Sequence, residues 1–307
     1  MSVLEFRPIE LDDVRKIYPY TSKYGENSCQ NSAVSMYSLF GKYGEHYAID
    51  NDLLYILRTG LCSDEYRVYL APMGENIKEG FMRLIKDAHI HDKKASFHTL
   101  TQRSAEILEQ ACPGRFEIEE RPDMGEYIYD VEKLSTYPGK QLKVHRRLVH
   151  KFWRTYEERL TMNTIGQEDL SEILEFAKSW LSERSSSEGI DPAEVASISG
   201  EFEAIRRQTA DFFALDLSGI VIRMDGKVCG FAYGTSLNDG CYDGIIEKGD
   251  LSIPAINKVL TQEIAKQCAN EHRYFNMEED LGLPGLRTVK LYYDPVTILK
   301  KYTAKEK

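Results

Sequence analysis

The sequence predicts an α/β protein, in the α+β sense, with two similar halves whose mixed sheets are flanked by helices. Three observations predict it. Helix-like and strand-like segments alternate along all 307 residues. The order of these segments after about residue 167 repeats their order before residue 130. A hydrophobic content of 42%, with 11% aromatic residues, is enough for a sizeable globular core.

The first half begins with two expected helices and a meander of three strands. The segment "LDDVRKIYPY" indicates a helix that ends before Pro19, because proline lacks the amide proton that a helix interior needs. Asn76 and Glu79 have the spacing of a capping box and indicate a helix from about residue 76. In chain order we expect helices at 11–18 and 32–44, strands at 46–50, 53–58 and 66–71, a helix from 76, a strand at 95–100, a helix at 104–111, and the short strands "FEIEE" and "YIYDV".

The second half repeats this order with a shift of about 175 to 180 residues. Asp191, Pro192 and Glu194 indicate the start of a long helix, as cap, first-turn proline and capping-box acid. In chain order we expect helices from about 167 and from 191, strands at 219–224, 227–234 and 241–247, a helix with Ile256, Leu260, Ile264 and Cys268 in one row, a strand at 273–277, a helix at about 284–292 and the last strand "TILKKYT". A duplication explains this repeat, and a chance likeness of two mixed halves is the alternative.

Two helices, three strands, a helix, a strand, a helix and a strand is the order of the GCN5-related N-acetyltransferase fold. In that fold the fourth and fifth strands are parallel neighbours that separate, and an acyl-carrier ligand enters the gap, where free backbone N–H groups are available. We therefore expect a tandem duplication of this fold. Its N-terminal half covers residues 1–138, and its C-terminal half, with a connecting basic helix, covers residues 139–307.

Two stretches, 126–156 and 275–295, resemble a bacterial family of duplicated acetyltransferase-like proteins. The family has no known function and is similar to the C-terminal domain of phosphatidylglycerol lysyltransferase. The residues that match its pattern are Gly139, Lys140, Arg146, Asn276, Glu278, Asp280, Gly282, Pro284, Gly285, Arg287 and Lys290; Gln141, His145 and Arg147 depart from it. The resemblance implies a tandem acyltransferase-type fold and supplies no reaction. The sister lysyltransferases move an aminoacyl group from tRNA to a lipid head group.

The composition narrows the possible functions. A net charge of −10 disfavours non-specific nucleic-acid binding, which needs many cations. No apolar run approaches the roughly 20 residues of a membrane span, and the first residues lack the layout of a signal peptide. The six cysteines are far apart and contain no CxxC motif, so we expect reduced thiols in the cytoplasm and no metal site.

A basic stripe lies between the halves. It consists of Lys140, Lys143, Arg146, Arg147, Lys151 and Arg154. Helical spacing places Lys143, Arg147, Lys151 and Arg154 on one side. Arg146 and Arg147 are candidate phosphate contacts for a tRNA end or a coenzyme. The alternative is an amphipathic connector whose cations are solvated or pair with the acidic remainder of the chain.

The segment 247–254, "EKGDLSIP", joins a strand to a helix in the second half. A helix N-terminus there could bind phosphate, with Glu247, Gly249 and Ser252 as candidate binding residues. Active acetyltransferases have a basic, glycine-rich segment at this point. Here there is one glycine, and Glu247 and Asp250 would repel a pyrophosphate. The coenzyme A motif is therefore not convincing.

The run "NMEED" follows the strand that lines the expected gap. Glu278, Glu279 and Asp280 are candidates for binding an ammonium group or for taking a proton from an attacking amine. Asn276, Arg287 and Lys290 are candidate binding residues beside them. The alternative is a helix start that is stabilised by acids paired with Arg287 and Lys290.

The tyrosines at the end of the same helix are candidates for the proton donor. Tyr292 or Tyr293 could protonate the leaving group, and packing is the alternative role for either.

Two hypotheses follow from these residues. The first is an acyltransferase or aminoacyltransferase that moves an acyl group from a thioester or an aminoacyl-tRNA to an amine or hydroxyl of a small acceptor. No cofactor is certain, and acyl-CoA is the candidate. The second is a non-catalytic module that binds a small molecule or a peptide on a degenerate acetyltransferase-like fold.

Overall fold

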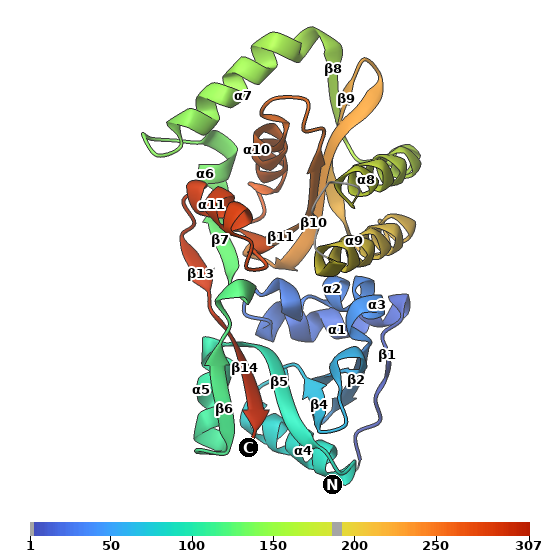
Figure 1. Ribbon diagram of the computed structural model, residues 1–307, viewed down its shortest axis with the longest axis vertical. Helices are drawn as coiled ribbons and strands as arrows, with labels where there is room; N and C mark the ends of the chain where they lie inside the picture. The colour runs from blue at the N-terminus through green and yellow to red at the C-terminus, as the bar shows by residue number, and fades with distance from the viewer. Residues whose placement is uncertain (1–2, 186–191) are drawn as a thin grey trace. The chain divides into compact units, whose positions relative to one another are not determined.

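The computed structural model describes residues 3–185 and 192–307, and the chain forms two compact units (Figure 1). Unit 1 contains residues 1–127, 279–287 and 298–307, and unit 2 contains residues 128–278 and 288–297. The chain therefore passes between the units four times. The expected division after residue 138 concerns the two duplicated halves and stays a prediction.

Unit 1 is a mixed sheet with helices against it. Its core includes Phe81 and Phe97, which are fully buried in edge-to-face contact. Its elements are β1 (Arg7–Pro8), α1 (Leu11–Tyr24), α2 (Ala33–Ser38), α3 (Phe40–Tyr43), β2 (Glu45–Asp50), β3 (Leu53–Arg58), β4 (Tyr66–Tyr69), α4 (Ile77–Ile90), β5 (Lys94–Thr101), α5 (Gln102–Ala111), β6 (Phe116–Glu120) and β14 (Lys301–Glu306).

Two local expectations for unit 1 are wrong. Helix α1 does not end before Pro19 but continues to Tyr24, because the buried residues Ile17 and Thr21 lie on both sides of the proline and hold the helix against the unit. Asn76 does precede α4, but its side chain makes no capping hydrogen bond. Its backbone, at φ −96° and ψ 52°, lies outside the extended region that a capping side chain needs.

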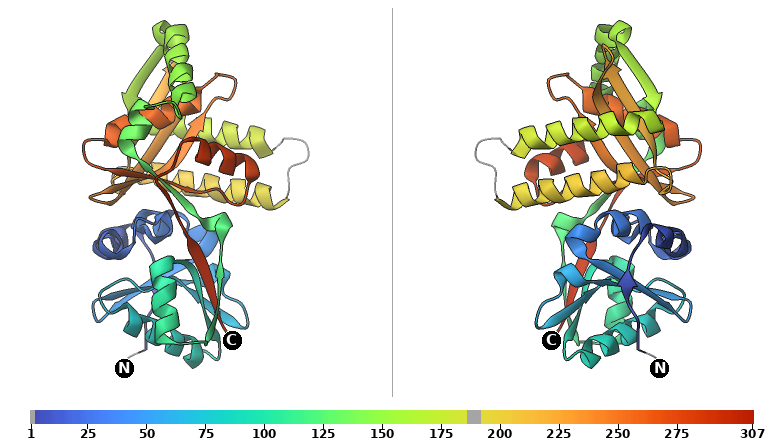
Figure 2. Two further views of the ribbon diagram at one scale, coloured as in Figure 1. Left: turned by 90° about the vertical axis from the view of Figure 1, so that its left-hand side faces the viewer. Right: turned by 90° about the vertical axis from the view of Figure 1, so that its right-hand side faces the viewer.

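Unit 2 has a second mixed sheet between two groups of helices. Helices α8 and α9 lie side by side (Figure 2), α8 packs on β10, and α10 packs on β9, β10 and β11. Its elements are α6 (Val131–Thr136), α7 (Lys143–Tyr156), β8 (Leu160–Thr164), α8 (Leu170–Ser185), α9 (Pro192–Ala210), β9 (Ser218–Met224), β10 (Lys227–Asn238), β11 (Cys241–Gly249), α10 (Ile256–Cys268) and β12 (Tyr274–Glu279). Besides β12, three elements contain a passage between the units: β7 (Glu126–Asp130), α11 (Pro284–Tyr292) and β13 (Thr297–Leu299). The expected cap at Asp191 lies outside the described residues, and so does the side chain of Glu194.

The tandem duplication is confirmed by the element order and by the two sheets. The strands of one sheet follow the order β1-β2-β3-β4-β5-β14-β6, and those of the other follow β8-β9-β10-β11-β12-β7-β13. The two orders match position by position except that β7 and β14, the last strands of the two halves, have exchanged sheets. Helix α10 begins 179 residues after α4, and β12 begins 180 residues after β5, as the repeat predicts.

A buried ion pair lies where the exchanged strand β14 begins. The Lys301 ammonium is 2.7 Å from the Glu126 carboxylate, and both side chains are fully buried. Ser28 Oγ and the Cys29 amide donate to the same carboxylate, each at 2.8 Å. Lys301 also donates to Ser28 Oγ. The pair therefore joins β14 to the residue at the start of β7 and to the turn after α1.

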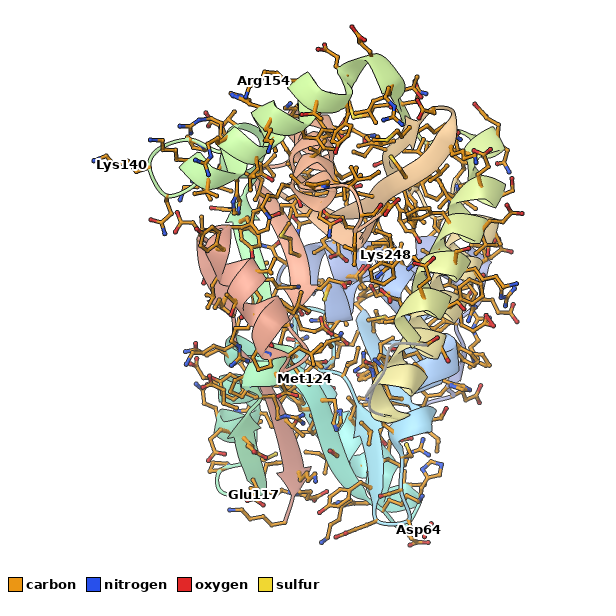
Figure 3. All side chains as sticks on the ribbon, turned by 45° about the horizontal axis from the view of Figure 1, so that its top comes forward. Asp64, Glu117, Met124, Lys140, Arg154 and Lys248 are labelled. Atoms are coloured by element: carbon orange, nitrogen blue, oxygen red, sulfur yellow. The ribbon has the colours of Figure 1, made fainter. Side chains whose placement is uncertain are left out.

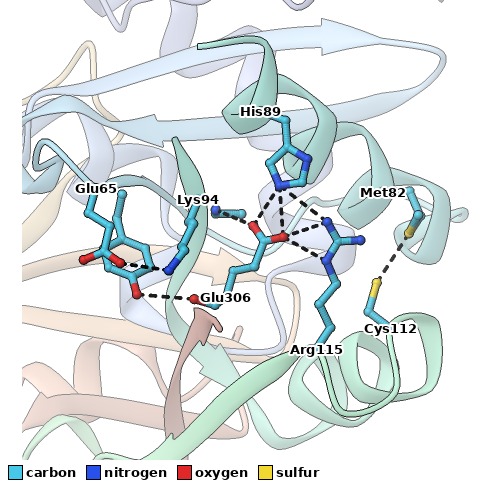
Figure 4. Close-up of polar contacts among 9 residues, drawn as sticks. Glu65, Met82, His89, Lys94, Cys112, Arg115 and Glu306 are labelled. Carbon is cyan, nitrogen blue, oxygen red and sulfur yellow. Dashed lines mark hydrogen bonds and ion pairs between the residues drawn. The ribbon is translucent and has the colours of Figure 1, made fainter. Parts of the chain in front are cut away.

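The other end of β14 is held by Glu306 (Figure 4). Its carboxylate accepts hydrogen bonds from the Ala95 amide at 2.8 Å and from Arg115 Nε at 2.8 Å, and it lies 2.9 Å from His89 Nε2. Burial alone would raise the pKa of Glu306, but the hydrogen bonds from Ala95, Arg115 and His89 outweigh it and hold that pKa below its ordinary value of 4.5.

Replacing Glu306 by glutamine is expected to destabilise unit 1 by about 1–3 kcal/mol at pH 7, because three donors lose a charged acceptor. The pKa of Glu306 is lowered in the folded state, so its contribution is complete above the ordinary pKa and declines as the pH falls through the lower folded pKa. Urea denaturation at pH 7 and below pH 4 would show a difference that shrinks in acid. Glu117→Gln, an exposed change on β6, is the control. Equal losses in both variants would contradict the role assigned to Glu306.

Candidate functional site

The candidate site begins where β11 and β12 separate in unit 2. The two strands are parallel, and they pair from Cys241 with Tyr274 to Asp243 with Asn276. Beyond these residues β11 continues to Gly249, paired with β10 on its other side, while β12 continues to Glu279. The sequence predicted this separation between the fourth and fifth strands of the second half.

Glu247 lies on β11 four residues beyond the last pair. Its Oε2 accepts a hydrogen bond from Thr261 Oγ1 of α10 at 2.7 Å. Burial raises the pKa of Glu247 to about 7, against the opposing effects of Thr261, Lys258, Lys248 and Lys290. A carboxylate with this pKa can take up and release a proton near neutral pH, as a general base must.

Tyr293 lies on the other side of Thr261 from Glu247. Its hydroxyl is 3.4 Å from Thr261 Oγ1, so Thr261 lies between Tyr293 and Glu247. Burial raises the pKa of Tyr293 well above its ordinary value, with the Glu247 charge acting in the same direction. Tyr293 therefore remains protonated and can act as a donor. Tyr292, the other candidate, is 53% exposed, and its ring lies against His145.

Several backbone N–H groups of the strand-to-helix segment after Glu247 already have acceptors. The Ser252 amide and hydroxyl both donate to Asp250 Oδ1, at 2.9 and 2.6 Å. The amides of Asp250 and Ile253 donate to the carbonyls of Cys229 and Asp250. Gly249 is needed for close packing, because a Cβ there would lie 2.4 Å from Asn257 Oδ1. A pyrophosphate would have to displace these contacts.

The acidic run does not follow its strand as expected, because β12 extends through Glu278 and Glu279 and does not end at Asn276. The Asn276 side chain is fully buried and accepts the Glu278 amide at 2.6 Å. Glu278 has a left-handed backbone, with φ 60°, and its carbonyl accepts from Lys290 Nζ at 3.2 Å. Lys290 also donates to the Met277 carbonyl, so this lysine binds main-chain oxygens at the end of β12.

Asp280 and Glu279 make separate contacts within unit 1. The fully buried Asp280 carboxylate accepts from Tyr127 Oη and Arg287 Nε, each at 2.6 Å, and from the Gly282 amide at 2.8 Å. Burial alone would raise the pKa of Asp280, but Arg287 and Tyr127 outweigh it and keep that pKa below its usual range. Glu279 accepts from Gln30 Nε2 at 3.0 Å.

Asp280 pairs with Arg287 at the start of α11, which agrees with the alternative that the acids stabilise the start of this helix. The catalytic and binding roles of Glu278, Glu279 and Asp280 stay predictions.

The basic stripe lies on α7 and the loop before it, where Figure 3 labels Lys140 and Arg154. Arg146 donates to the carbonyls of Tyr137 and Gly139 and so holds the turn before α7. Lys140, Lys143, Arg147, Lys151 and Arg154 are exposed, and within the described ranges their side chains form no ion pair. Among the described residues, these five cations are therefore not paired with the acidic part of the chain.

Two features of the site were not predicted from the sequence. Thr261, which connects Glu247 with Tyr293, directly follows Leu260 of the apolar row of α10 and is buried. Its position beside that row is the signal in the sequence that could have identified it. His145 is 1% exposed, and neither ring nitrogen has a hydrogen-bond partner among the residues that the structure describes. Burial lowers the pKa of His145 to about 4, so this histidine is neutral.

Over residues 3–185 and 192–307, no helix combines the length and the apolar character needed to cross a bilayer. The same residues contain no group of three or more histidine, cysteine, aspartate or glutamate side chains that could hold a metal ion.

The two sheets and the separating strands define a tandem GCN5-related N-acetyltransferase-like fold. The chain belongs to the family described as "Phosphatidylglycerol lysyltransferase, C-terminal", whose model matches residues 22–305. The predicted family resemblance is thereby confirmed.

Solved structures agree with this assignment. A conserved protein of unknown function from Bacteroides thetaiotaomicron is 28% identical, with a TM-score of 0.90 over 99% of this chain and 100% of that one. The C-terminal domain of a putative lysylphosphatidylglycerol synthetase from Agrobacterium fabrum has the same fold at 13% identity, with a TM-score of 0.69 over 96% of this chain and 92% of that one.

One curated relative is an uncharacterized protein from Mycoplasmoides gallisepticum. It is 25% identical over 179 residues, which are 58% of this chain. The match spans about half of that protein's length, 55%.

Proposed function

We propose that the chain is an aminoacyltransferase that acts in unit 2, with Glu247 as the general base. The observation that supports this most is the position of Glu247 beyond the point where β11 and β12 separate, next to Thr261 and Tyr293. Family membership supports transfer chemistry, since the family is named for a lysyltransferase.

The reaction proceeds by attack of an acceptor amine or hydroxyl on the carbonyl carbon of the donor ester. Glu247, directly or through a water molecule, takes the proton that the attacking nitrogen or oxygen loses. A bond forms between the acceptor and the acyl carbon, and the bond between that carbon and the ester oxygen breaks. The leaving oxygen receives a proton from Tyr293, which burial keeps protonated.

An aminoacyl ester is favoured over a coenzyme A thioester as the donor. Coenzyme A binding needs free N–H groups before α10. The Ser252 and Ile253 amides already donate to Asp250, and the Asp250 amide donates to a carbonyl of β10. Asp250 also adds negative charge where a pyrophosphate would lie. An aminoacyl-tRNA carries no pyrophosphate and does not need this loop.

Aminoacyl-tRNA is expected to raise the melting temperature of the full chain in a concentration-dependent way, while acetyl-CoA and longer acyl-CoAs leave it unchanged. Uncharged tRNA is the matched control, because it separates binding of the ester from binding of RNA. Transfer of a labelled amino acid to a panel of amine and hydroxyl acceptors gives the second readout. Stabilisation by an acyl-CoA, with no transfer from aminoacyl-tRNA, would contradict this proposal and favour an acyl-CoA thioester as the donor.

A further inference from the structure

We propose that unit 1 contains a binding site of its own, formed by three polar side chains where β5 and β14 change register, and that this site takes a small monocarboxylate. The side chains are those of His98 and Thr99 in β5 and of Thr303 in β14. All three residues belong to unit 1. The proposal goes beyond the transfer reaction assigned to unit 2 and does not depend on it.

These residues form a β-bulge between two neighbouring strands, which Figure 1 shows beside each other. Tyr302 pairs with Leu100 and Ala304 pairs with Phe97, so one residue of β14 lies opposite two residues of β5. Phe97, Leu100 and Ala304 are part of the apolar core on one face of the sheet. Because side chains alternate along a strand, the three residues between them direct their side chains to the other face.

The polar atoms of the bulge have no hydrogen-bond partner within the described ranges. Thr99 and Thr303 are 2% and 6% exposed, and the Oγ1 atom of each is buried without a hydrogen bond. The His98 ring is half-buried, and burial and nearby charges, not a hydrogen bond, determine its pKa. Buried hydroxyl groups ordinarily have a hydrogen-bond partner. Two such groups beside a histidine therefore indicate a ligand that supplies the missing acceptor.

The backbone at the bulge has the conformation of the corresponding place in unit 2. Thr99 has φ 53°, in the left-handed region that a β-branched residue rarely adopts. Glu278, at the matching position of the repeat, has φ 60°. Each lies two residues beyond the end of parallel pairing, which is at Phe97 in β5 and at Asn276 in β12. Unit 1 therefore has a strained residue where its own parallel strands separate, and such strain is typical of binding sites.

The charges around His98 favour an anion. Burial lowers the pKa of His98 to about 4, and the charges of Arg58, Arg121 and Lys305 act in the same direction. The ring is therefore neutral at pH 7, and one of its nitrogens carries a proton that it can donate. Two threonine hydroxyls and one imidazole N–H can together bind the two oxygens of a carboxylate, in a field that three cations make positive.

A single negative charge suits the site better than a doubly charged phosphate. Arg58 is 3.1 Å from the Glu45 carboxylate and Arg121 is 2.8 Å from that of Asp123, so both cations already have a partner. The two acids would repel a second negative charge. The donors of the bulge are neutral, which suits a monoanion. A free carboxylate is also distinct from the donor proposed for unit 2, whose carboxyl group is esterified.

Calorimetric titration of the full chain with acetate at pH 7 tests the proposal. One acetate is expected to bind per chain, at least tenfold more tightly than acetamide, which has nearly the same shape and no charge. Thr303→Val keeps the shape of the side chain and removes its hydroxyl, and His98→Phe removes the N–H donor. Each change should weaken acetate binding at least tenfold.

Further measurements separate binding from folding. Without ligand, Thr303→Val should have a melting temperature equal to or above that of the wild type, because it removes a buried hydroxyl that has no partner among the described residues. Thr161→Val, the same exchange at an exposed position of β8, should change acetate binding less than twofold. Glu247→Gln should also leave acetate binding unchanged, since Glu247 lies in unit 2.

Any one of four results would overturn the proposal. The first is the absence of saturable acetate binding. The second is wild-type affinity for acetate in Thr303→Val or in His98→Phe. The third is an equal loss in Thr161→Val or in Glu247→Gln, which would place the binding elsewhere in the chain. The fourth is binding of acetamide or inorganic phosphate as tight as that of acetate, which would contradict a monocarboxylate ligand.

Discussion

Replacing Lys301 by methionine is expected to destabilise unit 1 by about 3–5 kcal/mol. The Lys301 ammonium is 2.7 Å from the Glu126 carboxylate, and both side chains are fully buried. Methionine matches the length of the lysine side chain but leaves the Glu126 charge in the interior without its cationic partner, although Ser28 and the Cys29 amide still donate to it. An uncompensated buried charge costs far more than a lost surface contact.

The neighbouring lysine is a matched control. Lys300 is 54% exposed, and its ammonium is 3.2 Å from Glu120, which is 42% exposed. Lys300→Met should therefore cost about 1 kcal/mol or less. The double variant Lys301→Met/Glu126→Gln should recover part of the loss, because it removes the stranded charge together with its partner.

The measurement must report on unit 1. The two tryptophans, Trp153 and Trp180, both lie in unit 2, so their fluorescence does not follow unit 1 directly. Hydrogen exchange of peptides from β5 and β6, the strands on either side of β14, follows it. Loss of protection in Lys301→Met that is no larger than in Lys300→Met would contradict a buried pair.

Replacing Glu247 by glutamine is expected to lower kcat for transfer by about 10²–10⁴-fold, with a small change in KM and in stability. Glutamine keeps the shape of the side chain and a partner for Thr261 but cannot take a proton. The wild-type rate should rise with pH through about 7, as Glu247 loses its proton, and the variant should lack this rise.

The control for this prediction is Glu175→Gln, an exposed change on α8 in the same unit. Both variants are compared with wild type at several pH values, using the donor and acceptor that give wild-type turnover. A variant of Glu247 that keeps the wild-type rate and pH profile would assign the base to another residue, with Glu278 and Glu279 as the next candidates to substitute.

The element order was largely predictable from the sequence because periodicity reports local structure directly. The apolar row of Ile256, Leu260 and Ile264 indicated α10, and the structure has that helix from Ile256 to Cys268. The helix end predicted before Pro19 was wrong because tertiary packing of Ile17 and Thr21 outweighs the local cost of a proline in a helix.

The contacts of the site were less predictable because they join residues that are far apart in the sequence. Nothing around Glu247 indicates that Thr261 and Tyr293 lie beside it, or that burial raises its pKa. The acids at 278–280 look alike in the sequence, yet Asp280 is fully buried against Arg287 while Glu279 meets Gln30. Charged residues at strand ends are ordinarily exposed, so the burial of Lys301 and Glu126 had no signal either.

The exchange of β7 and β14 also determines the order in which the protein can be completed during its synthesis. The ribosome makes the N-terminal strands first, but the position between β5 and β6 belongs to residues 301–306, which follow every residue of unit 2 in the sequence. Until these residues leave the ribosome, β5 and β6 lack the strand that joins them, and each has an unpaired edge. The half of the protein that is translated first is therefore the half that finishes folding last.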